Sequence, residues 1–243
     1  MARPTSVLDV LPVRPPPDEA DEDAAQRARL DALPDPLPRL PFLWILMGSV
    51  RSGKSVFISN AIRRWYAKVF ARVIYCSPTV ENDASLWHLL HDDDVAIITG
   101  DRLSKLDDVV AALVTAKMAD PVDAKAHWLI VLDDCLGLLK PGGFVTHFAT
   151  RYRHSRVSLL VSCQQLRALP PTIRANASAY SIWRSTNGRE RAKLDEEFGE
   201  VIPHFLALYD DATAKPYHFL FVDLRRLRAF ANLTTLMYDS SSR

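Results

Sequence analysis

The chain has 243 residues, of which 48% are hydrophobic, so it is long enough to bury a full core in one domain. Its 30 Lys and Arg residues nearly balance its 29 Asp and Glu residues, and this net charge neither favours nor excludes a polyanionic partner. No apolar run of about 18 residues and no basic-then-apolar leader occurs, so the sequence predicts neither a membrane span nor a secretory signal and indicates an intracellular protein.

The first 40 residues differ in composition from the rest of the chain. They contain eight of the sixteen prolines and an acidic cluster at positions 18–23. Because proline removes backbone donors and blocks helices, this composition predicts a mobile tail over residues 1–40. The tail is solvated, or its acidic cluster folds over a basic surface. Residues 41–243 are predicted to form a single domain.

A phosphate-binding loop is predicted at residues 48–55. This stretch fits G-x-x-x-x-G-K-[ST], follows an apolar segment with strand propensity at 41–47, and precedes apolar residues at helical spacing over 56–65. Strand, glycine loop and helix are the context in which backbone N–H groups can surround phosphates at a helix N-terminus. The predicted nucleotide-binding residues are Gly48, Ser49, Val50, Arg51, Ser52, Gly53, Lys54 and Ser55.

Two side chains of this loop have specific predicted roles. Lys54 reaches the β and γ phosphates of ATP, and the Ser55 hydroxyl is a ligand of Mg²⁺. The alternative is a glycine-bearing turn without a ligand.

Shorter elements follow in alternation. Residues 72–76 and 95–98 are predicted strands, and apolar residues at helical intervals from Ser104 to Met118 predict an amphipathic helix. The three consecutive aspartates at 92–94 are predicted to form a solvated turn, because adjacent carboxylates in a turn cannot all face one ion.

A buried strand at 128–132 ends in two carboxylates, Asp133 and Asp134. An unbroken apolar run is typical of a central parallel strand, and ligands of open α/β sheets gather at the carboxyl ends of such strands. We therefore predict that Asp133 belongs to the Mg²⁺ shell and that Asp134 positions or deprotonates the attacking water. The alternative is a strand followed by an acidic turn.

A second buried strand, at 157–163, is followed by Gln164, whose amide is predicted to sense the γ phosphate. A surface amide is the alternative. Before this strand, a helix predicted over 144–153 has three closely spaced arginines close to its C-terminus, Arg151, Arg153 and Arg156. These either compensate the helix dipole or form a phosphate-facing patch, on DNA or on a neighbour's nucleotide.

The C-terminal part is predicted to contain a strand at 180–183 and a helix at 188–198. Apolar stretches at 205–209 and 217–222 are separated by a polar segment with Pro216 and predict a β-hairpin.

Several of these motifs, in this order, resemble the genome-packaging ATPases of poxviruses and other large DNA viruses and virophages, in the FtsK and HerA superfamily. The resemblance covers residues 41–223 and extends beyond the phosphate loop. Its further motifs are Cys76-Ser77-Pro78-Thr79 with Asn82-Asp83, the acidic strand end at 130–134, Arg153-His154 with the Gln164 strand, and the Pro-Pro-x-Ile-Arg-x-Asn segment at 170–176.

This resemblance implies an α/β fold, namely a RecA-like P-loop NTPase with a central, mostly parallel sheet flanked by helices. The glutamine strand is implied to lie between the loop strand and the acidic strand. Many relatives outside the viral group have Glu at the position of Asp134, and the shorter aspartate makes its role as base less secure than the Mg²⁺ role of Asp133.

The family likeness also implies an ATP-hydrolysing translocase of double-stranded DNA, assembled as a ring, in which an arginine of one subunit completes the neighbour's site. Arg174, and after it Arg153, are the positions that correspond to this arginine. Capsid proteins are implied partners, and the infected cell's cytoplasm or viral factory, and the virion, are implied locations. Alternatives are a cellular or plasmid helicase or conjugation pump and, in a different class, a P-loop kinase or nucleotide-gated scaffold.

Overall fold

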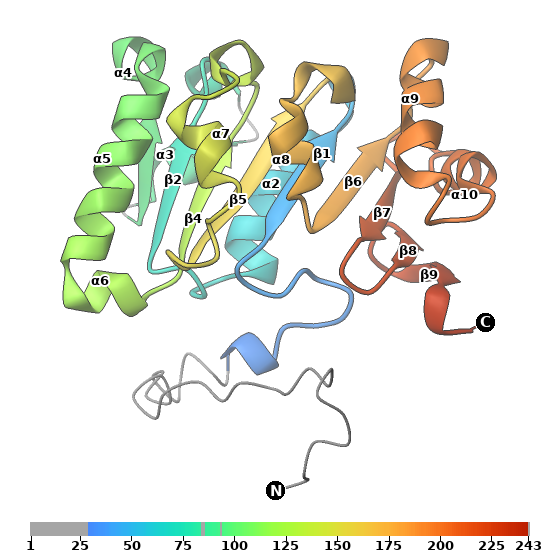
Figure 1. The fold of residues 1–243 in the computed structure, drawn as a ribbon, viewed down its shortest axis with the longest axis horizontal. Coiled ribbons are helices and arrows are strands. Elements are labelled where there is room, and N and C mark those ends of the chain that lie inside the picture. Colours follow the sequence, from blue (N-terminus) through green and yellow to red (C-terminus); the bar gives the residue numbers. More distant parts are fainter. Residues whose placement is uncertain (1–28, 84–85, 93, 243) are drawn as a thin grey trace, which may run out of the picture.

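The computed structural model describes residues 29–83, 86–92 and 94–242. A nine-stranded sheet forms the centre of this part of the chain, in the order β3-β2-β4-β5-β1-β6-β7-β8-β9 (Figure 1). The strands from β3 to β6 in this order are parallel, and β7, β8 and β9 are antiparallel. The bounds are β1 Leu43–Met47, β2 Arg72–Cys76, β3 Val95–Ile98, β4 Trp128–Leu132, β5 Val157–Cys163, β6 Ala179–Trp183, β7 Phe219–Asp223, β8 Arg228–Ala231 and β9 Thr235–Asp239.

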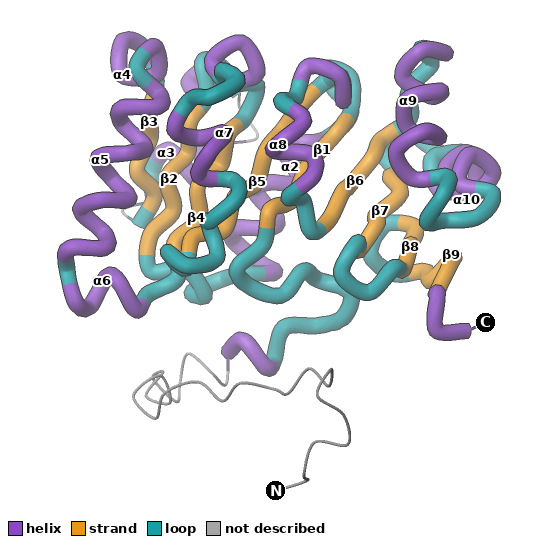
Figure 2. Tube along the Cα trace, in the orientation of Figure 1, coloured by secondary structure: helices purple, strands orange, loops and turns teal. Residues whose placement is uncertain are grey.

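Helices cover both faces of the sheet (Figures 1 and 2). Residues of α5, α7 and α8 pack on one face, and residues of α2 and α3 pack on the other. A π-helical turn, Ala61–Trp65, continues α2. The helices are α2 Lys54–Asn60, α3 Trp87–Leu90, α4 Gly100–Ser104, α5 Leu106–Ala119, α6 Pro121–Lys125, α7 Phe144–Phe148, α8 Pro171–Ala175, α9 Gly188–Phe198 and α10 Phe205–Ala212.

The central strand β1 illustrates why these strands have unbroken apolar sequences. Leu43, Ile45 and Met47 belong to the core under α5 and α7, whereas Trp44 and Leu46 belong to the core under α2. Successive side chains of a strand point to opposite faces, so both sets must be apolar when helices cover both faces. All five residues are at most 1% exposed.

The predicted position of the glutamine strand is confirmed. β5 pairs in parallel with β1 on one side and with β4 on the other. The carboxyl ends of these three strands therefore lie at one edge of the sheet, which is the upper edge in Figure 1.

The antiparallel C-terminal end is also confirmed, but one of its predicted strands is wrong. Residues 205–209 belong to the helix α10, in which Phe205, Tyr209 and Ala212 are buried at i, i+4 and i+7. This spacing buries one stripe of a helix against α9 and the sheet. The hairpin is instead formed by β7 and β8, and β9 extends it.

Residues 33–41 connect to the folded domain near the lower edge of the sheet (Figure 1). Leu33 and Leu37 are 5% and 3% exposed and belong to the core that contains Tyr66, and the Tyr66 hydroxyl donates to the Pro38 carbonyl at 2.7 Å. Part of the predicted tail thus packs on the domain. The acidic cluster at 18–23 lies outside the described residues, and the predicted mobility of the tail stays a prediction.

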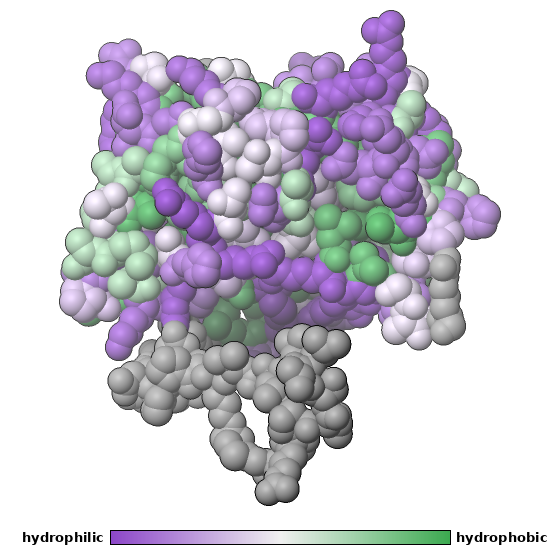
Figure 3. Space-filling model, viewed as in Figure 1, coloured by the Kyte–Doolittle hydropathy of each residue, from purple (hydrophilic) through white to green (hydrophobic). Residues whose placement is uncertain are grey.

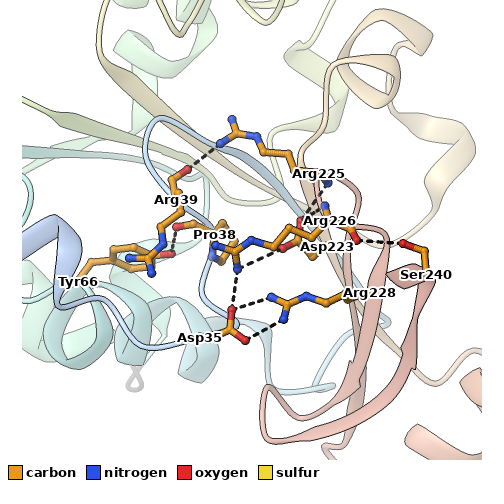
Figure 4. A network of polar contacts seen from close by, with 9 residues as sticks. All are labelled: Asp35, Pro38, Arg39, Tyr66, Asp223, Arg225, Arg226, Arg228 and Ser240. Atoms are coloured by element: carbon orange, nitrogen blue, oxygen red, sulfur yellow. Dashed lines mark hydrogen bonds and ion pairs between the residues drawn. The ribbon is translucent and has the colours of Figure 1, made fainter. Parts of the chain in front are cut away.

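Three arginines hold this segment: Arg225 and Arg226 in the turn after β7, and Arg228 at the start of β8 (Figure 4). Arg226 and Arg228 each approach Asp35 at 2.6 Å, and their hydrogen bonds and charges lower the pKa of the Asp35 carboxyl, Arg228 contributing most. Arg225 donates to the carbonyls of Arg39 and Pro41 at 3.0 and 2.6 Å. The start of β1 is therefore tied to the β7–β8 turn.

Within the described ranges, no helix combines the length and the apolar composition that crossing a membrane requires.

Substitution of Leu37 tests the packing of this N-terminal segment. Leu37→Ala should lower the free energy of unfolding by about 2–5 kcal/mol, because it removes buried methyl groups and leaves a cavity. The measurement is urea unfolding followed by tryptophan fluorescence. Leu236→Ala on β9 is the control, since Leu236 is 52% exposed. Equal stabilities of the two variants would show that the segment does not pack on the domain in solution.

Candidate active site at the carboxyl edge of the sheet

The phosphate loop begins where β1 ends, at Met47. The Gly48 amide donates to the Cys163 carbonyl at 3.0 Å, which attaches the start of the loop to the end of β5. A Cβ atom on Gly48 would lie 2.5 Å from Ser52 Oγ and 2.9 Å from Trp183 Cβ, so a larger residue would displace both neighbours. Close packing thus requires glycine at the first position of the motif.

Two residues of the loop have left-handed backbone conformations. Gly53 has φ 103°, which glycine adopts without steric cost, and Arg51 has φ 63°. Turns of this kind direct successive backbone N–H groups to one side and form anion-binding concavities. The first N–H groups of α2 add to the same side, because they have no partner within the helix.

Lys54 is buried, with 7% of the residue exposed, and its ammonium lies over the loop. Its Nζ donates to the carbonyls of Gly48 and Ser49 at 2.7 and 3.0 Å. Burial lowers the pKa of Lys54, and the nearby carboxylates of Asp134 and Asp133 partly offset this effect. The hydrogen-bond partners of this ammonium among the described residues are carbonyl oxygens, which it can exchange for phosphate oxygens.

Asp133 is the first residue after β4 and is 5% exposed. Its Oδ2 accepts a hydrogen bond of 2.7 Å from the Tyr75 hydroxyl on β2. Burial raises the pKa of the Asp133 carboxyl, and the hydrogen bond from Tyr75 and the charge of Lys54 act in the opposite direction. The carboxylate is therefore fixed in position but poorly solvated, which suits it to bind a cation.

Asp134 differs from its neighbour in both conformation and exposure. Its φ of 52° is left-handed, a conformation that aspartate tolerates better than most residues, and it is exposed to solvent. The sharp turn sends the chain away from β4 directly after the buried carboxylate.

An open pocket of about 680 Å³ brings these groups together. It is lined by residues 50–56, both aspartates and Gln164, so the predicted residues Val50, Arg51, Ser52, Gly53, Lys54, Ser55, Asp133, Asp134 and Gln164 meet at one place. Gly48 lies beneath the loop, and Ser49 borders a neighbouring hollow.

Four residues that line this pocket were not among the predicted site residues: Thr79, Asp83, Tyr217 and Val56, which directly follows the predicted loop. A signal for the first two exists in the sequence, because they are polar residues that follow a strand adjacent to the acidic strand. Tyr217 has no such signal, since only the path of the chain from α10 to β7 places it beside the loop.

The pocket fits a nucleoside triphosphate with Mg²⁺. The Ser52 hydroxyl oxygen is buried without a hydrogen-bond partner among the described residues, and Lys54 presents a cation. Ser55 and Asp133 supply the hydroxyl and carboxylate oxygens that Mg²⁺ prefers, with phosphate and water oxygens completing its shell.

Neither predicted trans arginine lines this pocket. Arg174, on α8, forms an ion pair of 2.6 Å with Glu197 on α9, and its side chain is 15% exposed. Arg153 lies in the turns that precede β5, because α7 ends at Phe148, earlier than predicted. It is exposed, and its Nε donates to the Tyr152 hydroxyl at 3.3 Å.

Arg153 and Gln164 are separated by the whole length of β5. Seven residues at about 3.3 Å each span roughly 23 Å, so Arg153 lies at the opposite edge of the sheet from the phosphate loop of its own chain.

The sequence profile of the poxvirus A32 protein family matches residues 34–191. The chain belongs to this family. The predicted poxvirus-type resemblance is thereby confirmed. No curated protein sequence is significantly similar to this member of the A32 family.

Solved structures show the same fold at low sequence identity. The genome packaging NTPase B204 of Sulfolobus turreted icosahedral virus 2, in complex with ATP-gammaS, superposes with a TM-score of 0.59 at 18% identity, over 81% of this chain and 98% of that chain. B204 of Sulfolobus turreted icosahedral virus, described as a DNA-packaging ATPase, gives 0.62 at 16% identity, over 79% and 97%.

A third similar structure comes from a cellular system. ATPases 2 and 3 of Thermomonospora curvata EccC, with a signal sequence peptide, give a TM-score of 0.53 at 17% identity, over 82% of this chain and 37% of that one. These comparisons confirm the P-loop NTPase fold of the A32 family member.

Removal of the buried charge at Asp133 should stabilise the nucleotide-free protein. Because the folded-state pKa of Asp133 is raised, the ionised carboxylate costs stability above that pKa, and the cost disappears as the pH falls below it. Asp133→Asn should therefore raise the unfolding temperature near pH 7, and the gain should shrink at lower pH. Differential scanning calorimetry without Mg²⁺ measures this difference.

Asp134→Asn is the matched control and should change the unfolding temperature little, because Asp134 is exposed. A lower unfolding temperature for Asp133→Asn would show that attraction to Lys54 outweighs the burial of the charge.

Proposed function

We propose that this chain hydrolyses ATP to ADP and phosphate and uses the energy to move double-stranded viral DNA into a capsid. The observation that carries the proposal is the meeting of the phosphate loop, two consecutive carboxylates and Gln164 in one pocket of an A32 family member. The B204 proteins, which share the fold, are described as genome packaging and DNA-packaging enzymes, one of them in complex with an ATP analogue.

Each side chain of the pocket has a distinct role in this proposal. The loop amides and Lys54 bind the phosphates, and Ser55 and Asp133 hold Mg²⁺, which supplies charge to the β and γ phosphates. Asp134 is exposed in the pocket, so it can reach a water molecule and orient or deprotonate it. Gln164 hydrogen-bonds that water or the γ phosphate. When hydrolysis removes the γ phosphate, Gln164 loses this partner and the change is transmitted along β5.

The side chains at the edge opposite the pocket favour a DNA partner, bound through its phosphates and without regard to sequence. A band of hydrophilic side chains crosses the lower part of the folded domain in Figure 3, and hydrophilic side chains also cover its upper edge. Arg151 lies over the Phe144 ring, and Arg225 binds main-chain carbonyls. Among the described residues neither of these two forms an ion pair with a carboxylate, so their charges can attract phosphate groups.

The positions of the two candidate arginines favour a ring in which Arg153 acts on the neighbour's nucleotide. Arg174 already pairs with Glu197 inside its own chain, whereas Arg153 is exposed and too far from its own pocket to serve it. This reverses the order that sequence resemblance gave. Capsid proteins and the virus-infected cell are the proposed partners and location.

The proposal is tested by ATP hydrolysis with and without long duplex DNA, combined with the molecular mass in solution. Wild-type turnover should rise with duplex length, and the stimulation should fall steeply and log-linearly with salt. Lys54→Ala should abolish nucleotide binding, whereas Asp134→Asn should bind ATP and turn it over about 10²–10⁴-fold more slowly.

If the rate of ATP hydrolysis is the same with and without duplex DNA, at every DNA length and every salt concentration, the translocase is rejected. The kinase or scaffold alternative then remains. Loss of ATP binding in Asp134→Asn, with binding retained in Asp133→Asn, would reverse the two carboxylate roles.

Complementation tests the arginine in trans. Arg153→Ala subunits keep an intact pocket, and Lys54→Ala subunits keep Arg153, so each should be inactive alone and a mixture should recover part of the wild-type ATPase rate. Arg174→Ala is the control. It should lower stability, because it leaves Glu197 without its partner, and it should not be rescued. Rescue of Arg174→Ala but not of Arg153→Ala would assign the role to Arg174.

A further inference from the structure

A second hollow, of about 380 Å³, lies beside the phosphate pocket. The two hollows share Arg51, Ser52 and Tyr217, so they are adjacent at the phosphate loop. The second hollow extends away from the aspartates, toward the end of β6 at Trp183 and the segment between α10 and β7.

Tyr217 stands on the boundary between the hollows and is 73% exposed. Its ring lies 3.5 Å from the position that a Cβ on Gly53 would occupy, so it stands directly beside the phosphate loop. Because the ring is exposed at this place, its face is available to a ligand held by the neighbouring loop.

The backbone of Tyr217 is held in an unusual conformation. Its φ of 65° is left-handed, which is rare for a bulky residue, and the Trp183 indole Nε1 donates to its carbonyl at 3.1 Å. This hydrogen bond uses the backbone of Tyr217, so the turn keeps its anchor when the side chain is changed. The ring is positioned by the turn and not by packing into the core.

The walls of the second hollow supply hydrogen-bond donors. Arg184 and Lys215 are cationic. Another polar residue of the wall is His218, whose tautomer follows from the orientation of the neighbouring Asn232 amide. Asn232 accepts the Phe219 amide with Oδ1, so its Nδ2 donates to His218 Nδ1 at 2.8 Å, and in a neutral ring the imidazole hydrogen lies on Nε2.

We propose that this second hollow binds the base and ribose of the nucleotide, with Tyr217 stacked on the base. The inference rests on the proposed function, because the phosphates of the same nucleotide must lie in the neighbouring pocket. An aromatic ring offers a stacking surface to any base, and the wall donors suit the ring nitrogens of a base and the oxygens of a ribose.

The test compares a nucleotide with its phosphate part alone. Dissociation constants for a non-hydrolysable ATP analogue and for tripolyphosphate, both with Mg²⁺, are measured by calorimetry on the full chain. The wild type should bind the nucleotide more tightly than tripolyphosphate. Tyr217→Ala should weaken nucleotide binding about tenfold to a hundredfold and leave tripolyphosphate binding unchanged.

Two further variants separate stacking from other effects. Tyr217→Phe keeps the ring and should bind both ligands like the wild type, and Leu236→Ala on β9 controls for a general surface change. Lys54→Ala should weaken both ligands together. Equal binding of both ligands by the wild type, unchanged nucleotide binding in Tyr217→Ala, or an equal loss of both ligands in that variant would overturn the base site alone.

A wild-type protein that binds neither ligand would overturn the proposed function together with the base site, so the two failures are distinguishable.

Discussion

The pairing of β5 between β1 and β4 determines where every reactive side chain lies. Hydrogen-bonded parallel registers align Met47 with Cys163 and Leu132 with Val161, so the residues that follow these strands emerge close to one another. This register is sufficient to bring the phosphate loop, the aspartates and Gln164 together. This ladder is stable because helices cover both faces of the sheet and keep water from its hydrogen bonds.

Charge burial makes the site ready for a triphosphate. Lys54 and Asp133 are both removed from water. Burial lowers the pKa of Lys54 and raises the pKa of Asp133, and both shifts favour the neutral form of the group. Their mutual attraction and the Tyr75 hydroxyl offset only part of that cost. Phosphate oxygens near Lys54 and a cation near Asp133 would satisfy both groups at once. Bound phosphate and a bound cation would therefore relieve the unfavourable burial of these two charges in the candidate site.

The sequence predicted the central strands, the phosphate loop and the pocket residues that belong to single continuous motifs. It failed at 205–212, where Phe-Leu-Ala-Leu-Tyr is short and apolar enough to fit a strand, and only the burial of Ala212 completes the helical spacing. It could not rank the arginines either. The partner of Arg174 is 23 residues away on another helix, and no local pattern in the sequence indicates this ion pair.

The hydrogen bonds of Arg225 to the carbonyls of Arg39 and Pro41 fix the position of the N-terminal end of β1. One end of this short strand continues into the phosphate loop, and the other end is held at the far edge of the sheet. A hydrogen-bonded strand is stiff along its axis. Movement of β1 along its axis would break its pairing with β5 and β6 as well as the two hydrogen bonds of Arg225. β1 therefore links the position of the phosphate loop to that of the β7–β8 turn at the opposite edge of the sheet.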